Sequence, residues 1–165
     1  MNYEVKDIKL APDGHRKIQW VKNNMPVLSQ LEKEFEKAKP FENVKISLSI
    51  HMEAKTAYLC KVLVAGGAVL SATGSNVLST QDDVAAALAD SGISVFAVHG
   101  ASEREYMKHI EMCLQQKPNI IIDDGGDLVS VLHKQRPDLA ENVWGGCEET
   151  TTGIIRLKAM EKDKV

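Results

Sequence analysis

The sequence predicts an α/β protein built on an open parallel sheet. Apolar runs of strand length alternate with helical patterns of about 10 to 15 residues, which is typical of right-handed βαβ units. Four of these runs end in a compact polar cluster. Because the carboxyl ends of parallel strands share one edge, where ligands bind, we expect these clusters to meet around one small molecule. The expected fold is a three-layer, Rossmann-like or flavodoxin-like sheet with helices on both faces.

The first half of the chain predicts two helices before the first strand. Apolar residues recur every three or four positions over residues 12–38, and Pro26 breaks this run, so two packed helices are expected rather than one. The alternation then begins with a strand at 45–50, a helix at 53–65 and a strand at 68–73.

The second half continues the same alternation. We expect helices at 80–90, 102–116, 127–135 and 151–162, and strands at 93–98, 119–123 and 143–146. Residues 1–165 are expected to form one domain. The chain ends in a charged helix without a capping glycine, as a piece of a longer protein would, although a frayed natural terminus has the same appearance.

Composition excludes several classes of function. The net charge of -3 gives no electrostatic reason to bind nucleic acid or an anionic membrane. No apolar run approaches the ~20 residues that span a bilayer, and the first residues do not resemble a signal peptide. The three cysteines, Cys60, Cys113 and Cys147, form no CxxC motif, which favours reduced thiols in the cytoplasm over a disulfide framework or a metal site. For Cys60 and Cys113 we expect core positions.

An acidic cluster follows the strand expected at 119–123. Crowded carboxylates raise one another's affinity for protons, which suits Asp124 to general base catalysis. The two glycines after it allow a backbone to approach a ligand closely. Asp127 is better explained as the cap of the next helix.

A second cluster, Glu148-Glu149-Thr150-Thr151-Thr152-Gly153, precedes the last helix. The three threonines line a helix N-terminus with hydroxyl groups, where diols or phosphate oxygens bind readily. An extended N-cap explains the same residues equally well.

Two further clusters have weaker signals. His51 follows a predicted strand, with Glu53 and Lys55 within one helical turn. Histidine can exchange protons near neutral pH, although a lone histidine beside an apolar run is more often structural. Ser79 and Asp82 have the spacing of a capping box, which predicts a structural role for both.

Taken together, these motifs resemble the S-adenosyl-L-homocysteine hydrolase (adenosylhomocysteinase) family. Similarity extends from about Val5 to about Glu161. The stretches that carry it are Ile50-His51-Met52 with Ala54–Ala57, Asn76 with Leu78–Leu88, Ile121–Leu128, and Glu148–Gly153.

The resemblance implies a redox-assisted elimination on a nucleoside thioether. In this family a bound NAD oxidises the ribose 3′-hydroxyl, the proton at C4′ becomes acidic, and its removal expels homocysteine from C5′; water then adds and the hydride returns. The resemblance implies that His51 assists proton transfer at the leaving group and that Asp124 acts as an acid or base. It implies that Glu149 binds the ribose hydroxyls. It places Ser79 near the nucleoside, and Thr150, Thr151 and Thr152 near the nicotinamide.

Glu53 and Lys55 occupy the positions that read the purine base in this family, where Thr or Gln and then Glu are common. Hypoxanthine has an acceptor at C6 and a donor at N1, which a lysine donor and a carboxylate acceptor match better than they match adenine. We therefore hypothesise a preference for S-inosyl-homocysteine.

The resemblance also implies that the chain is incomplete for catalysis. The family's proton-relay lysine and aspartate, its NAD-binding domain and its C-terminal tail correspond to nothing in residues 1–165, and the chain has no GxGxxG motif. We expect the N-terminal segment of a substrate-binding domain, inactive alone, from a cytoplasmic enzyme that is usually a homotetramer. The alternative is a non-catalytic module that binds nucleosides or associates with full-length subunits.

Overall fold

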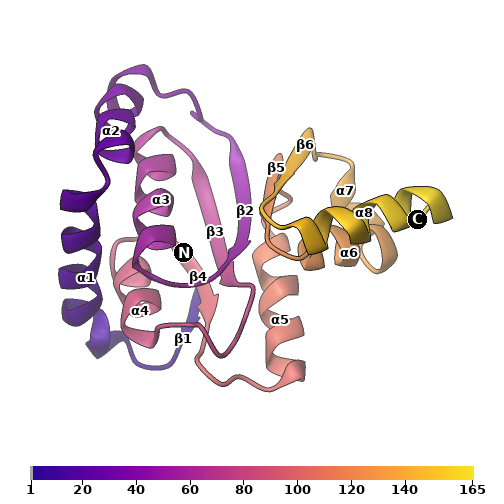
Figure 1. Cartoon of the computed structure of the whole chain (residues 1–165), viewed down its shortest axis with the longest axis horizontal. Coiled ribbons are helices and arrows are strands. Elements are labelled where there is room, and N and C mark those ends of the chain that lie inside the picture. Colours follow the sequence, from indigo (N-terminus) through magenta and orange to yellow (C-terminus); the bar gives the residue numbers. More distant parts are fainter. Residues whose placement is uncertain (1) are drawn as a thin grey trace.

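Six parallel strands form one sheet in the computed structural model, which describes residues 2–165 (Figure 1). In spatial order they are β1 (Tyr3–Val5), β4 (Ser94–Ala97), β3 (Val69–Gly74), β2 (Lys45–Ile50), β5 (Ile120–Asp123) and β6 (Gly145–Glu148). The predicted α/β class with a parallel sheet is therefore confirmed. The order of the five strands from β4 to β6 is that of a Rossmann fold rather than of flavodoxin.

Helices cover both faces of this sheet, as predicted. They are α1 (Ala11–Asn24), α2 (Pro26–Ala38), α3 (Ala54–Ala65), α4 (Asp82–Asp90), α5 (Glu103–Leu114), α6 (Asp127–Lys134), α7 (Pro137–Ala140) and α8 (Thr151–Asp163). Helices α3 and α4 lie on one face, and α5 and α6 on the other (Figure 1). Helices α1 and α2 pack outside α3 and α4 and so add a further layer, and the predicted break at Pro26 separates them.

The core is centred on β2, which is buried at every position after Lys45. Two serines face this core, and Ser47 satisfies its hydroxyl by donating to the carbonyl of Cys113 at 2.6 Å. Cys60 and Cys113 are fully buried, as expected, and burial raises the pKa of their thiols to about 12 and about 11. Both therefore pack as small uncharged groups.

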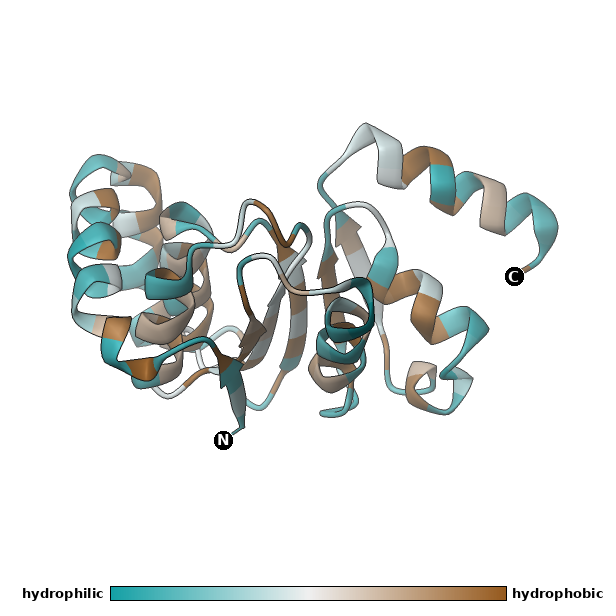
Figure 2. Cartoon of the chain, turned by 90° about the horizontal axis from the view of Figure 1, so that it is seen from below, coloured by the Kyte–Doolittle hydropathy of each residue, from teal (hydrophilic) through white to brown (hydrophobic). Residues whose placement is uncertain are grey.

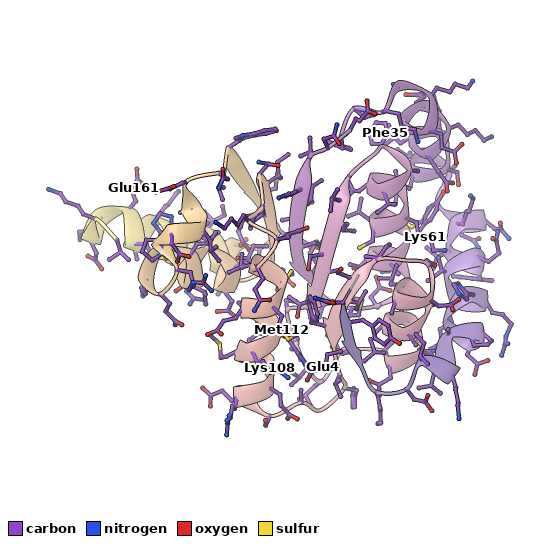
Figure 3. All side chains as sticks on the ribbon, turned by 180° about the vertical axis from the view of Figure 1, so that it is seen from behind. Glu4, Phe35, Lys61, Lys108, Met112 and Glu161 are labelled. Carbon is purple, nitrogen blue, oxygen red and sulfur yellow. The ribbon has the colours of Figure 1, made fainter. Side chains whose placement is uncertain are left out.

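Three parts of the fold differ from the sequence prediction. Strand β1 and helix α7 were not predicted, because each is too short to show a periodic pattern. Strand β1 is held by parallel pairing with the distant strand β4. The carboxylate of Glu4 also forms an exposed ion pair with Lys108 of α5 at 2.6 Å, and Figure 3 labels both residues. Strand β6 lies two residues later than the predicted 143–146, so that Glu148 belongs to the strand.

The strand order reverses next to β2. The chain runs from β2 outward through β3 and β4, and then returns to place β5 on the other side of β2. In open α/β sheets the crevice outside such a reversal is the usual place for a ligand. His51 and Asp124 follow the two strands that flank it.

Gly14 allows α1 to approach α4 closely. A Cβ atom at this position would overlap the carbonyl oxygen of Asp83 and lie 2.8 Å from the Cβ of Ala87. We expect Gly14→Ala to lower the free energy of unfolding by roughly 1–3 kcal/mol through overpacking, although alanine is favoured over glycine in a helix by about 1 kcal/mol. Urea denaturation measures this change. Gly145→Ala is the control, because a Cβ there meets no atom within 4 Å. Equal stability of the two variants would contradict the packing argument.

Candidate functional site

Three polar side chains meet beyond the carboxyl ends of β2, β3 and β5. The Nδ1 atom of His51 lies 2.5 Å from the hydroxyl of Ser79, and its Nε2 atom lies 3.4 Å from Oδ2 of Asp124. The side chain of His51 is 49% exposed, whereas that of Asp124 is only 8% exposed. The imidazole is therefore open to a ligand from the solvent side, while the carboxylate behind it is held in place.

Ser75 completes this cluster, and sequence reasoning missed it. Its hydroxyl donates to Oδ2 of Asp124 at 2.7 Å, and its carbonyl accepts from Tyr106 at 3.4 Å. The signal that could have found it is its place in the sequence. It follows β3 directly, on the strand next to β2, so its side chain had to lie at the same edge.

Glu149 lies at the same edge of the sheet, after β6. Its backbone N–H donates to the carbonyl of Asp123 at 2.9 Å, while its side chain is exposed. Strands β2, β5 and β6 are neighbours, so the structure brings His51, Asp124 and Glu149 to the ends of three adjacent strands. Their chemical roles remain predictions.

Glu148 holds the loops around the site together. One carboxylate oxygen accepts from the backbone N–H of Gly125 at 2.8 Å, and from the N–H and hydroxyl of Thr150 at 2.9 and 2.8 Å. Burial acts to raise the pKa of Glu148, but these donors outweigh it and the pKa is lowered. A side chain at Gly153 would overlap the same carboxylate, so the glycine lets the helix start beside it.

The three threonines differ in their contacts within the protein. The hydroxyl of Thr150 accepts from the N–H of Gly153 at 2.9 Å and caps α8. Thr151 and Thr152 lie in the first turn of that helix with exposed side chains. All three threonines begin the helix beside Glu149, and their binding of a cofactor stays a prediction.

The prediction that Asp127 caps α6 is wrong. The N-cap is Gly126, whose φ of +79° turns the chain into the helix without a side-chain bond. Asp127 is already helical, and its carboxylate accepts from Tyr106 at 2.7 Å and from Arg156 at 2.6 Å. It therefore connects α5, α6 and α8, and supports the loop that carries Asp124.

The predicted capping box at Ser79 and Asp82 is also wrong. In a capping box the serine is the N-cap and the acid is the third helical residue. Here the N-cap of α4 is Gln81 and Asp82 is the first helical residue, so Ser79 and Asp82 form no box. The hydroxyl of Ser79 instead donates to the carbonyl of Asn76 at 3.1 Å and faces His51. A capping box does occur at the start of α5, between Ser102 and Glu105.

Glu53 and Lys55 lie at the start of α3. Glu53 is the N-cap, and its carboxylate accepts from the N–H of Thr56 at 3.3 Å. Both side chains line a cavity of about 460 Å³, whose other wall is α1 with Trp20. A second cavity, of about 320 Å³, lies beside Ser75 between the loop after β3 and α5.

Comparison with known proteins identifies the family. The family model described as S-adenosyl-L-homocysteine hydrolase matches residues 2–142. The chain belongs to this family. It is 55% identical to an adenosylhomocysteinase of Pyrococcus abyssi over 99% of this chain and 39% of that protein. It is 53% identical to an S-inosyl-L-homocysteine hydrolase of Methanocaldococcus jannaschii over 98% of this chain, again 39% of that protein. The chain thus spans about two fifths of the length of these relatives.

Residues 2–165 show neither a metal-binding cluster nor a membrane-spanning helix. No group of three or more His, Cys, Asp or Glu side chains in this range is arranged to hold a metal ion. No helix in the same range has the length and apolar character needed to cross a membrane.

Asp123 is a buried acid beneath the site. It is 1% exposed, and its carboxylate accepts from the N–H groups of Asp124 at 3.0 Å and Val129 at 3.2 Å. Burial raises its pKa to about 6, and the charge of Glu148 adds to the rise, although the two N–H donors oppose it. The native state therefore keeps a proton on Asp123 at a pH where the unfolded chain has lost it.

We expect Asp123 to make the protein less stable as the pH rises from about 4 to 6. Because the native pKa lies above the unfolded value, the native state binds more protons in this window, and the free energy of unfolding falls by up to roughly 3 kcal/mol. Urea denaturation of wild type and Asp123→Asn across this range isolates the effect by subtraction. A stability difference that does not change with pH would contradict it.

Proposed function

We propose that the chain is the substrate-binding portion of a hydrolase that cleaves the thioether of S-adenosyl- or S-inosyl-L-homocysteine into the nucleoside and L-homocysteine. The observation that carries this proposal is the His51–Asp124 pair, 3.4 Å apart at the reversal of strand order. Membership of the S-adenosyl-L-homocysteine hydrolase family supports the choice of substrate.

His51 and Asp124 are proposed to move protons at the nucleoside. The exposed imidazole can give or take a proton at the sulfur-bearing C5′, since its two ring nitrogens can act as donor and acceptor. Asp124, whose carboxylate accepts from Ser75 and faces His51, is placed to act as the partner acid or base. Glu149, with its exposed carboxylate at the next strand end, is proposed to bind the ribose hydroxyls.

The residues at the start of α8 fit the nicotinamide end of NAD. The exposed hydroxyls of Thr151 and Thr152, at a helix N-terminus beside Glu149, are suited to bind a carboxamide. When bound, NAD supplies a hydride acceptor for the ribose 3′-carbon, which makes the neighbouring C4′ proton removable. We propose that the rest of the NAD site comes from the part of the relatives that this chain does not span.

Glu53 and Lys55 are proposed to select the purine. A lysine donor and a carboxylate acceptor match the C6 oxygen and the N1–H of hypoxanthine. The names of the relatives do not decide between the two bases, because both adenosylhomocysteinases and S-inosyl-L-homocysteine hydrolases are about half identical to the chain. The proposal therefore rests on these two side chains, which line one cavity.

A second candidate is a non-catalytic module that binds nucleosides or associates with full-length subunits. The observation that favours it is the cavity lined by Glu53 and Lys55, which is formed by residues 16–55 and does not include His51 or Asp124. We also propose that the full-length protein is a homo-oligomer of the cytoplasm, where the three free cysteines stay reduced.

Calorimetric titration with adenosine and inosine tests the binding proposal. We expect both nucleosides to bind and inosine to bind about tenfold more tightly, the effect of one well-placed hydrogen bond. Lys55→Gln is expected to reduce this preference. Lys45→Gln is the matched control, because Lys45 is an exposed lysine at the opposite edge of the sheet. Tighter binding of adenosine would reject the purine assignment, and no binding of either nucleoside would reject the proposed function.

Catalysis is testable in a chimaera in which the chain replaces the matching part of the Pyrococcus abyssi relative. We expect the chain alone to show no hydrolysis and the chimaera to be active. His51→Ala and Asp124→Asn are each expected to lower kcat of the chimaera by roughly 10²–10⁴, the usual contribution of a general acid or base. His133→Ala, at an exposed histidine of α6, serves as the control. Hydrolysis by the chain alone, or full activity of both variants, would contradict the assignment.

A further inference from the structure

An exposed indole lines the cavity beside Glu53 and Lys55. Trp20 is 68% exposed, although α1 buries Ile18 and Val21 of the same turn against the core. The side chain lies in the wall of the cavity of about 460 Å³ between α1 and the start of α3. A large aromatic side chain left in water beside an open cavity marks a surface suited to an apolar ligand.

The polar groups around this cavity restrict the ligand further. Of its three cationic side chains, Arg16 and Lys17 are already paired, with Asp13 and Asp83. The groups at the α3 side of the cavity are the carboxylate of Glu53 and the exposed ammonium of Lys55. An aromatic wall with one acceptor and one donor suits a flat heteroaromatic ring that carries both a donor and an acceptor on its edge.

One residue that lines the cavity, Glu53, follows the candidate catalytic residue His51 closely in sequence. The N–H of Glu53 donates to the carbonyl of His51 at 2.9 Å, in the tight turn that leads from β2 into α3. The wall of the cavity at α3 therefore begins two residues after His51, the proposed acid/base.

We propose that Trp20 is the stacking surface for the purine base and thus a binding residue that α1 adds to the site. The inference rests on the proposed function, since it takes the ligand to be a purine nucleoside. Stacking on an indole does not distinguish adenine from hypoxanthine, because both have the same two fused rings. Trp20 contributes affinity, while Glu53 and Lys55 contribute the choice of base.

The second tryptophan provides a matched internal control. The chain has two tryptophans, and Trp144 is exposed to nearly the same extent, at 71%. It precedes β6, at the edge of the sheet opposite to the site, where its backbone N–H donates to the carbonyl of Asn119. A ligand that stacks on Trp20 leaves Trp144 unaffected.

Fluorescence titration of single-tryptophan variants tests the proposal. In Trp144→Phe, which retains Trp20, adenosine and inosine are expected to quench the emission and to saturate with the Kd that calorimetry gives. In Trp20→Phe, which retains Trp144, binding is expected to leave the emission unchanged. Trp20→Ala is expected to raise Kd for both nucleosides about tenfold, Trp20→Phe less than that, and Trp144→Ala not at all.

The outcomes separate this inference from the proposed function. If calorimetry shows binding but Trp20 emission does not respond and Trp20→Ala binds normally, the stacking role is wrong and nucleoside binding stands. If no variant, nor the wild type, binds either nucleoside, both proposals are wrong. Circular dichroism checks that Trp20→Ala keeps its fold, and the emission of Trp144→Phe gives an answer that does not depend on that variant.

Discussion

The reversal of strand order beside β2 is the constraint on which the rest of the structure depends. Because β3 and β5 both pair with β2 in parallel, three segments distant in sequence end at one edge of the sheet. The contacts of His51 with Ser79 and Asp124 exist only because of this pairing. Backbone pairing with β3 on one side and β5 on the other sets the register of β2, so the polar residues that follow it emerge at a defined place.

Acidic side chains below the edge support the loops above it. The carboxylate of Glu148 accepts from the N–H groups of Gly125 and of Thr150, the N-cap of α8. Asp127 joins α5, α6 and α8 through Tyr106 and Arg156. These bonds matter because α8 packs little against the sheet and projects from the molecule (Figure 2). The groups that hold the first turn of α8 in place are therefore the ones that place Thr151 and Thr152.

The candidate site combines residues that the sequence clusters indicate with residues that only the structure brings to it. The sequence clusters at strand ends supply the polar groups, and the structure adds Ser75 behind Asp124 and Trp20 across from Glu53. Neither residue belongs to a cluster that stands out in the sequence. Ser75 is one of many serines, and Trp20 lies in an amphipathic helix far from the strand ends. Their relevance follows from what they face, which a pattern of residue types does not contain.

The sequence by itself determined the α/β class, the break at Pro26, the core positions of Cys60 and Cys113, and the edge at which the polar clusters gather. Those features follow from local periodicity and from the geometry that parallel strands share. The tertiary structure alone decided which groups Asp127, Ser79 and Thr150 bond to. A carboxylate or hydroxyl near a helix start can cap that helix or bond elsewhere at similar energy, so the choice depends on which partner the fold brings within reach.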